Sequence, residues 1–232
     1  MAAPGGWLVD TAGVYGRVFR RGAALAARNW QLAGVIAASL EVLDLGLPWL
    51  ARLGIVGGLL VTLAMTACTS AALALAGEIV RGGRIKWGGV PAAFGTFLGD
   101  LLTLGFIVWG LQLVAGLALA PFPFLLIVFG LAALVFLNAV PELVYLGRQP
   151  PAALLVASYR FIGENWIEWF PANVLLLGLL WVTMQIPDGF GDVMGTMAWS
   201  AALSYALVVR GLLFLELIVS SRRAREFRRL AG

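Results

Sequence analysis

Two acidic residues lie three positions apart inside an apolar run near the start of the chain. Glu41 and Asp44 would share one face of a helix, because side chains three apart on a helix are neighbours. Inside a membrane, such a pair of carboxylates could bind a cation or relay a proton. Arg52 follows shortly after them and could neutralise one of the two. We therefore favour a structural role for the pair, with cation binding and proton relay as the alternatives.

Two further ionisable residues, Asp100 and Arg210, also lie inside apolar runs. Counted from the ends of their runs, they would lie at a similar depth. We expect Arg210 to pair with Asp100 or with Glu41, because a lone charge in an apolar environment is costly. Arg210 could instead extend its long side chain to the membrane surface. The candidate polar site within the membrane consists of Glu41, Asp44, Asp100 and Arg210.

A glutamate followed six positions later by an arginine occurs three times. The pairs are Glu78 with Arg84, Glu142 with Arg148, and Glu216 with Arg222. Each glutamate comes near the end of an apolar run, where a paired arginine would make its charge tolerable. We expect three ion pairs that fix where the chain leaves the membrane. The alternative is a ring of three carboxylates around a central cavity.

The composition places these residues in a membrane protein. Hydrophobic residues make up 61% of the 232 residues and charged residues 12%, a balance that a soluble protein of this size does not reach. A membrane-spanning helix needs about 20 predominantly apolar residues. Six such runs cover residues 30–49, 54–79, 94–117, 122–144, 170–186 and 196–219. The sequence therefore predicts an all-α membrane helix bundle with six transmembrane helices in a single domain, 1–232.

The predicted helices form three consecutive pairs, and each motif glutamate ends the second helix of a pair. This regularity predicts an internal repeat of helix hairpins. The repeat units are about 7–80, 81–148 and 149–222, followed by a basic tail at 222–232. An amphipathic segment precedes each hairpin, at 7–28, 84–93 and 150–162, and we expect these segments to lie at the cytoplasmic surface.

The basic residues orient the predicted helices. Fourteen of the sixteen fall on one side of a six-span topology, whereas the opposite connections contain only Arg52. Since basic residues concentrate on the cytoplasmic side, both termini should be cytoplasmic. We expect a multi-pass protein of a bacterial cytoplasmic (inner) membrane. The N-terminal stretch has no unbroken apolar core, so we expect no secretory signal.

Several chemistries lack the residues that they require. The chain has no histidine, and Cys68 is its single cysteine, so neither a disulfide within the chain nor a thiolate metal site is expected. No pairing of serine with lysine or of two aspartates indicates hydrolysis, and no nucleic-acid-binding motif accompanies the arginines. We expect no enzyme activity, no cofactor, no metal and no nucleic-acid partner.

The stretch PELVYLGRQPPAALLVASYRFIGENW, which starts at Pro141 and includes Ser158 and Asn165, resembles part of a six-helix membrane domain of bacteria and archaea. That domain occurs alone or fused ahead of glycerophosphodiester phosphodiesterase domains. The resemblance covers about 25 residues in motif and most of the chain in topology. It implies a six-helix membrane fold and assigns no residue roles. Because the predicted membrane domain takes up the 232 residues, we expect no phosphodiesterase domain in this sequence.

The sequence favours a non-enzymatic accessory or scaffold subunit that binds lipid or a partner membrane protein. Basic residues beside Trp87 and in the tail indicate contacts with anionic lipid headgroups at the cytoplasmic face. The alternative is a small transporter or lipid-handling permease with a polar path between the three hairpins, and a membrane enzyme comes third. Water access to Asp100 and Arg210 would favour transport. Burial of these residues beside a broad apolar flank would favour partner binding.

Overall fold

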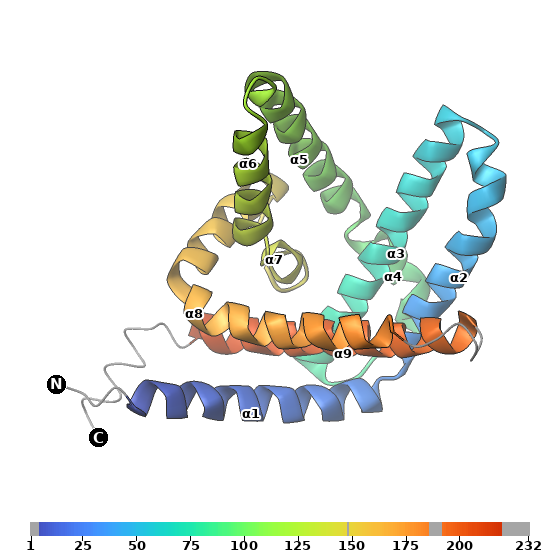
Figure 1. Ribbon diagram of the computed structural model, residues 1–232. Coiled ribbons are helices and arrows are strands. Elements are labelled where there is room, and N and C mark those ends of the chain that lie inside the picture. Colours follow the sequence, from blue (N-terminus) through green and yellow to red (C-terminus); the bar gives the residue numbers. More distant parts are fainter. Residues whose placement is uncertain (1–4, 148, 186–191, 220–232) are drawn as a thin grey trace.

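The computed structural model describes residues 5–147, 149–185 and 192–219, and this part of the chain is helical and contains no strand (Figure 1). The all-α prediction is confirmed. The α-helices are α1 (Gly5–Arg28), α2 (Gln31–Ala51), α3 (Ile55–Gly82), α4 (Val90–Thr96), α5 (Leu98–Leu119), α6 (Pro123–Phe136), α7 (Val140–Leu146), α8 (Pro151–Thr183) and α9 (Asp192–Val219). A short 3-10 helix, η1 (Trp87–Gly89), precedes α4.

Six helical segments of the described chain are long and apolar enough to cross a membrane. Each of them overlaps one of the six predicted runs. The segments are Gln31–Ala51, Ile55–Gly82, Trp87–Leu119, Pro123–Leu146, Pro151–Thr183 and Val193–Val219. The protein is therefore a multi-pass integral membrane protein by the length and composition of its helices.

Helix α9 is the centre of the structure. It contacts α1, α2, α3, α7 and α8. The rest of the protein buries 56% of its most apolar stretch of 18 residues. Its buried side chains include Val208, Val209, Leu213 and Phe214. By contrast, only 6% of the most apolar stretch of 18 residues in Pro123–Leu146 is buried. The apolar core thus surrounds one helix, and most other helices expose apolar side chains.

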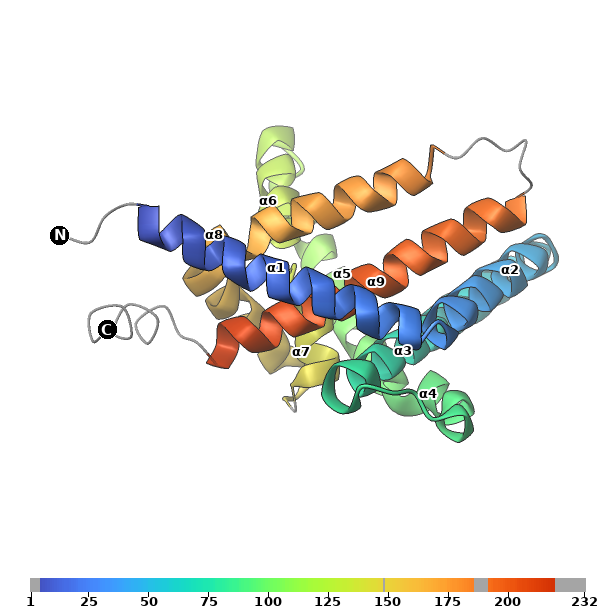
Figure 2. The same cartoon turned by 90° about the horizontal axis from the view of Figure 1, so that it is seen from below.

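The helix pairs lean apart. In Figure 1, α2 with α3 and α5 with α6 rise from a common base and diverge, while α8 and α9 run across beneath them. Figure 2 shows the same base from below, where α1 crosses α9. Helix α9 contacts α2 and α3, whereas α8 contacts α5 and α6. The internal repeat stays a prediction.

Glycine shapes two of the turns at helix ends. Gly54 (φ 59°) immediately precedes α3 after the turn from α2, and Gly83 (φ 74°) follows the last residue of α3. The left-handed conformation at Gly83 directs its N–H to the carbonyl of Ile79 at 2.8 Å, which ends the helix with a common C-terminal motif. The chain then turns back towards α4.

Helix α8 differs from its prediction. The sequence predicts an interfacial segment at 150–162 and a separate span from Phe170, whereas the structure has one helix of 33 residues. Its buried side chains, which include Phe161, Asn165, Trp169 and Asn173, continue along one face across the predicted boundary. Pro171 lies inside the helix without ending it, and Figure 1 shows that α8 is curved, as helices that contain proline often are.

Candidate functional site

The predicted span at 122–144 is interrupted, which the sequence reading did not anticipate. Helix α6 ends at Phe136, and α7 begins at Val140. Pro141 has no N–H to donate to the Leu137 carbonyl, so the N–H of Val140 donates to that carbonyl instead, at 3.1 Å. At the break, not every N–H donates to the carbonyl four residues earlier, as it would in a regular helix. Inside a membrane, the backbone groups at such a break must find partners within the protein.

Side chains from two other helices bond to the carbonyls at this break. Ser158 on α8 donates its hydroxyl to the carbonyl of Phe136 at 2.7 Å. Arg210 on α9 donates Nη2 to the carbonyl of Asn138 at 2.6 Å. The break is therefore held by α8 and α9 rather than by its own helix.

Arg210 also forms a two-fold hydrogen-bonded ion pair with Glu142 on α7. Its Nε lies 2.6 Å from Oε1 of Glu142, and its Nη2 lies 2.8 Å from Oε2. Its Nη1 donates to Oδ1 of Asn173 at 2.7 Å. The Glu142 side chain is completely buried, and that of Arg210 is 19% exposed. Because guanidinium and carboxylate meet in matched geometry, each charge compensates the other where water is largely excluded.

Trp169 completes this cluster. The Arg210 Cζ atom lies 5.1 Å from the centroid of the Trp169 ring, which is a cation–π distance. The indole Nε1 donates to Oδ1 of Asn138 at 2.8 Å, and Nδ2 of Asn173 donates to the carbonyl of Trp169 at 2.7 Å. We call these five residues the Arg210 cluster: Asn138, Glu142, Trp169, Asn173 and Arg210. Their hydrogen bonds join the α6–α7 break, α8 and α9.

The predicted pairing of Arg210 with Asp100 or Glu41 is wrong, because its partner is Glu142. Asp100 lies exposed in the first turn of α5, and Glu41 lies on α2 beside a different cavity. Sequence reasoning also missed Asn138, Trp169 and Asn173. One signal for these residues was present in the sequence, since Pro141 interrupts a run that also contains an asparagine.

The three motif glutamates lie in different environments. Glu142 is buried, whereas Glu78 and Glu216 are exposed. Among the described residues, Glu78 and Arg84 form no ion pair within 4.0 Å, so that predicted pair is wrong. Oε1 of Glu216 accepts a hydrogen bond from Nη2 of Arg17 at 3.3 Å. The other predicted partners, Arg148 and Arg222, lie outside the described residues.

Glu41 and Asp44 face a cavity of about 680 Å³ among α2, α3, α8 and α9. Its wall includes Thr183 and Trp199. Arg52 does not neutralise either acid in the part of the chain that the structure describes, where neither forms an ion pair within 4.0 Å. Its guanidinium instead lies 4.7 Å from the centroid of the Trp49 ring. The two carboxylates thus share a cavity, as their spacing predicts.

A second cavity, of about 410 Å³, opens beside the Arg210 cluster between α6, α8 and α9. Asn138, Asn173 and Arg210 provide its polar wall, while leucines from the three helices, such as Leu134 and Leu180, provide the apolar part. Four of the five N–H donors of Arg210 already bond to protein acceptors, so this wall has few hydrogen-bond donors left for a ligand.

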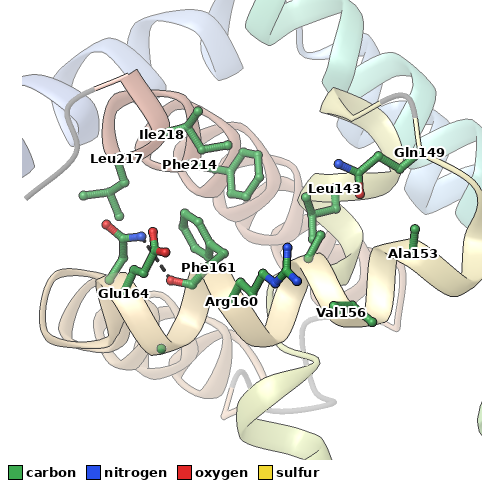
Figure 3. A pocket seen from close by; sticks show the side chains of 13 residues that line it. Leu143, Gln149, Ala153, Val156, Arg160, Phe161, Glu164, Phe214, Leu217 and Ile218 are labelled. Carbon is green, nitrogen blue, oxygen red and sulfur yellow. Dashed lines mark hydrogen bonds between the residues drawn. The ribbon is translucent and has the colours of Figure 1, made fainter.

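A third cavity, of about 1050 Å³, lies between α7, the first half of α8 and the end of α9 (Figure 3). The rings of Phe161 and Phe214 meet along it with centroids 4.7 Å apart. Arg160 and Glu164 project from α8 at its edge. This combination of an apolar floor and a charged edge could accommodate an amphipathic molecule.

Comparisons of the chain with models of protein families, with curated proteins and with solved structures found no match. Within the described residues, no group of three or more His, Cys, Asp or Glu is placed to hold a metal ion.

Proposed function

We propose that this protein is a non-enzymatic accessory or scaffold subunit of a bacterial cytoplasmic membrane, with both termini in the cytoplasm. Its partner is another membrane protein that binds the flank formed by α5 and α6. Lipid covers the remaining apolar surfaces. The six apolar helices support the membrane location, and the distribution of arginines supports the orientation.

The observation that carries this proposal is the low burial of α5 and α6. In the most apolar stretch of 18 residues, only 11% is buried in Trp87–Leu119 and only 6% in Pro123–Leu146. Large side chains remain exposed along both helices, among them Phe106, Leu117, Phe124 and Leu134. Figure 1 shows this pair projecting away from the base. Apolar surfaces of this extent are typical of sites that other helices or lipid cover.

The Arg210 cluster supports a structural role over a transport path. A transported ion needs polar groups that are free to exchange partners, whereas Arg210 already bonds to Glu142, Asn173 and the carbonyl of Asn138. These bonds fix the broken span against α8 and α9. These bonds support a scaffold role, because they hold three elements together at the base while the flank of α5 and α6 stays exposed.

Photo-crosslinking in native membranes tests the proposal. A photoreactive amino acid is placed at Phe106 or Leu134 on the flank, and at Leu59 on α3 as a control of comparable exposure. We expect a discrete protein adduct from the two flank positions and lipid adducts alone from Leu59. Lipid adducts alone from all three positions would exclude the partner.

One observation favours a lipid-handling permease as the second candidate. Glu41 and Asp44 share a cavity that is lined by residues of α2, α3, α8 and α9. A permease would need these carboxylates for translocation, so Glu41→Gln with Asp44→Asn would abolish the movement of fluorescent lipid between leaflets of reconstituted vesicles. A protein that moves no lipid above the protein-free rate would exclude this candidate.

A further inference from the structure

Three basic side chains meet at one cleft at the end of α3. The cleft has a volume of about 520 Å³ and is lined by Arg81, Arg84 and Lys86. Glu78 is the one acidic residue in its lining, so the cleft carries a net charge of about +2. The motif-based pairing of Glu78 with Arg84 would reduce this charge, but the two side chains form no ion pair among the described residues.

The loop that carries Arg84 and Lys86 is held in place by a buried side chain. Asn29, which is 2% exposed, donates Nδ2 to the carbonyl of Gly83 at 3.1 Å. Its Oδ1 accepts a hydrogen bond from the N–H of Ile85 at 3.0 Å. The backbone on both sides of Arg84 is therefore held in place, so this part of the loop does not need to be ordered when a ligand binds.

Arg81 is anchored separately. Its Nη2 donates to the carbonyl of Tyr145 on α7 at 2.8 Å, which leaves the other donors of the guanidinium available to a ligand. This bond also closes the wall of the cleft on the α7 side. Tyr145 thus holds the Arg81 guanidinium, and Asn29 separately holds the backbone beside Arg84.

Most of the other residues that line the cleft are apolar and small. They include Gly77, Ala92 and Ala93, and Phe97 also lines the cleft. At the nearby surface, the exposed rings of Trp30 and Trp87 pack edge to face with centroids 6.2 Å apart. Paired tryptophans next to basic residues are typical of the headgroup level of a membrane. Cations and an apolar wall in one cleft match a molecule with a charged head and an apolar tail.

We propose that this cleft binds the phosphate group of an anionic phospholipid. Arg81, Arg84 and Lys86 hold the phosphate oxygens, and the wall of Gly77 and Ala92 receives the start of the acyl chains. The site goes beyond the proposed function, because partner binding by α5 and α6 does not require a lipid at α3. A free phosphate ion shares the headgroup chemistry, but it would make no use of the apolar wall.

Native mass spectrometry of the full-length protein in a non-ionic detergent tests the site. The probes are phosphatidylglycerol and phosphatidylcholine. The cleft variant combines Arg84→Gln with Lys86→Gln, and the control combines Arg20→Gln with Arg21→Gln on the exposed side of α1, which removes the same charge. We expect the cleft variant to bind phosphatidylglycerol about tenfold more weakly or worse. The control should bind as the unchanged protein does, and phosphatidylcholine binding should be weak in all three.

Equal weakening in the cleft variant and the control would overturn the proposal, because it would indicate diffuse surface charge. Unchanged binding in the cleft variant would overturn it as well. Displacement of the lipid by millimolar inorganic phosphate would contradict the assignment to a phospholipid. A photoreactive phosphatidylglycerol provides a readout on the unchanged protein, and its adducts should map to residues 74–97. All of these outcomes are independent of crosslinking from α5 and α6.

Discussion

Arg210 on α9 holds the carboxylate of Glu142 on α7 through two hydrogen bonds, of 2.6 Å and 2.8 Å. The two residues are 68 positions apart, and their contact joins the interrupted fourth span to the central helix. The same guanidinium bonds to the carbonyl of Asn138 at the helix break. The two buried charges therefore neutralise each other, and the same guanidinium provides a donor to a carbonyl at the break.

Removing one member of this pair should destabilise the protein strongly. Arg210→Gln leaves Glu142 buried without its counter-charge, which costs about 3–5 kcal/mol. The double replacement of Arg210→Met with Glu142→Leu removes both charges, and its cost should be clearly smaller than the sum of the costs of Arg210→Met and Glu142→Leu made singly. Thermal unfolding in detergent measures these differences.

The matched control is Arg52→Gln, because Arg52 also lies over a tryptophan ring but is exposed. It should cost at most about 1 kcal/mol. If Arg210→Gln were as mild as this control, or if the single costs simply added, the pair would not hold the break.

Close packing of α9 at Gly211 gives a second prediction. A Cβ on Gly211 would lie 2.6 Å from the Tyr145 hydroxyl oxygen and 2.9 Å from a methyl carbon of Val80. Tyr145 is 1% exposed and bonded to the carbonyl of Leu207, so it cannot move aside easily. Gly211→Ala should therefore lower stability by about 1–3 kcal/mol.

Gly105→Ala on α5 is the control for Gly211→Ala, since no atom lies within 4 Å of the added Cβ there. It should be neutral or slightly stabilising, because alanine favours helix. Equal unfolding temperatures for the two variants would show that α9 does not pack against Tyr145 as described.

The attachment of α1 to α8 should weaken in alkaline solution. Tyr15 donates its hydroxyl to the carbonyl of Glu168 at 2.6 Å. Burial raises the pKa of this hydroxyl above its usual value, and the nearby Glu168 charge adds to the rise. Because the folded-state pKa is the higher one, the stabilising contribution is complete below about pH 10 and is lost as the pH rises through the folded pKa.

Comparison with Tyr15→Phe isolates this effect from other groups that titrate in the same range. The difference in unfolding temperature between the unchanged protein and the variant should be constant from pH 7 to about pH 9.5 and should shrink or reverse above it. A difference that stays constant up to pH 11 would mean that the Tyr15 hydroxyl is not ionised in this window or does not hold α1.

The spans could be predicted from the sequence because their signal is local. An apolar run of sufficient length, bounded by charge, glycine or proline, is enough to place a helix such as α2 or α3 within a few residues. The α6–α7 break was also encoded locally, in Pro141, but the length of the apolar run concealed it. Pro171 shows why such a signal is ambiguous, since the same residue type lies inside α8 without ending it.

The Arg210 cluster could not be predicted in the same way. The partner of Arg210 depends on how α7 and α8 are rotated towards α9, and spacing along one helix carries no information about that rotation. Depth in the membrane suggested Asp100 and Glu41 as partners, but neither lies against this face of α9. The motif glutamates illustrate the same limit, because similar local sequences place Glu142 in the core and Glu78 at the surface.

The orientation of the spans is the claim on which the lipid site and the partner flank both depend. Cys68→Ala gives a background without cysteine, and single cysteines are then placed at Leu53 and Ala120 in the tight turns and at Arg20 and Arg84 on the basic side. A membrane-impermeant thiol reagent is added to intact cells and to permeabilised cells. The account predicts labelling of positions 53 and 120 in intact cells, and labelling of positions 20 and 84 only after permeabilisation. Labelling of position 20 or 84 in intact cells would contradict the account. A lack of labelling at positions 53, 120 and 20 alike in intact cells would contradict it as well.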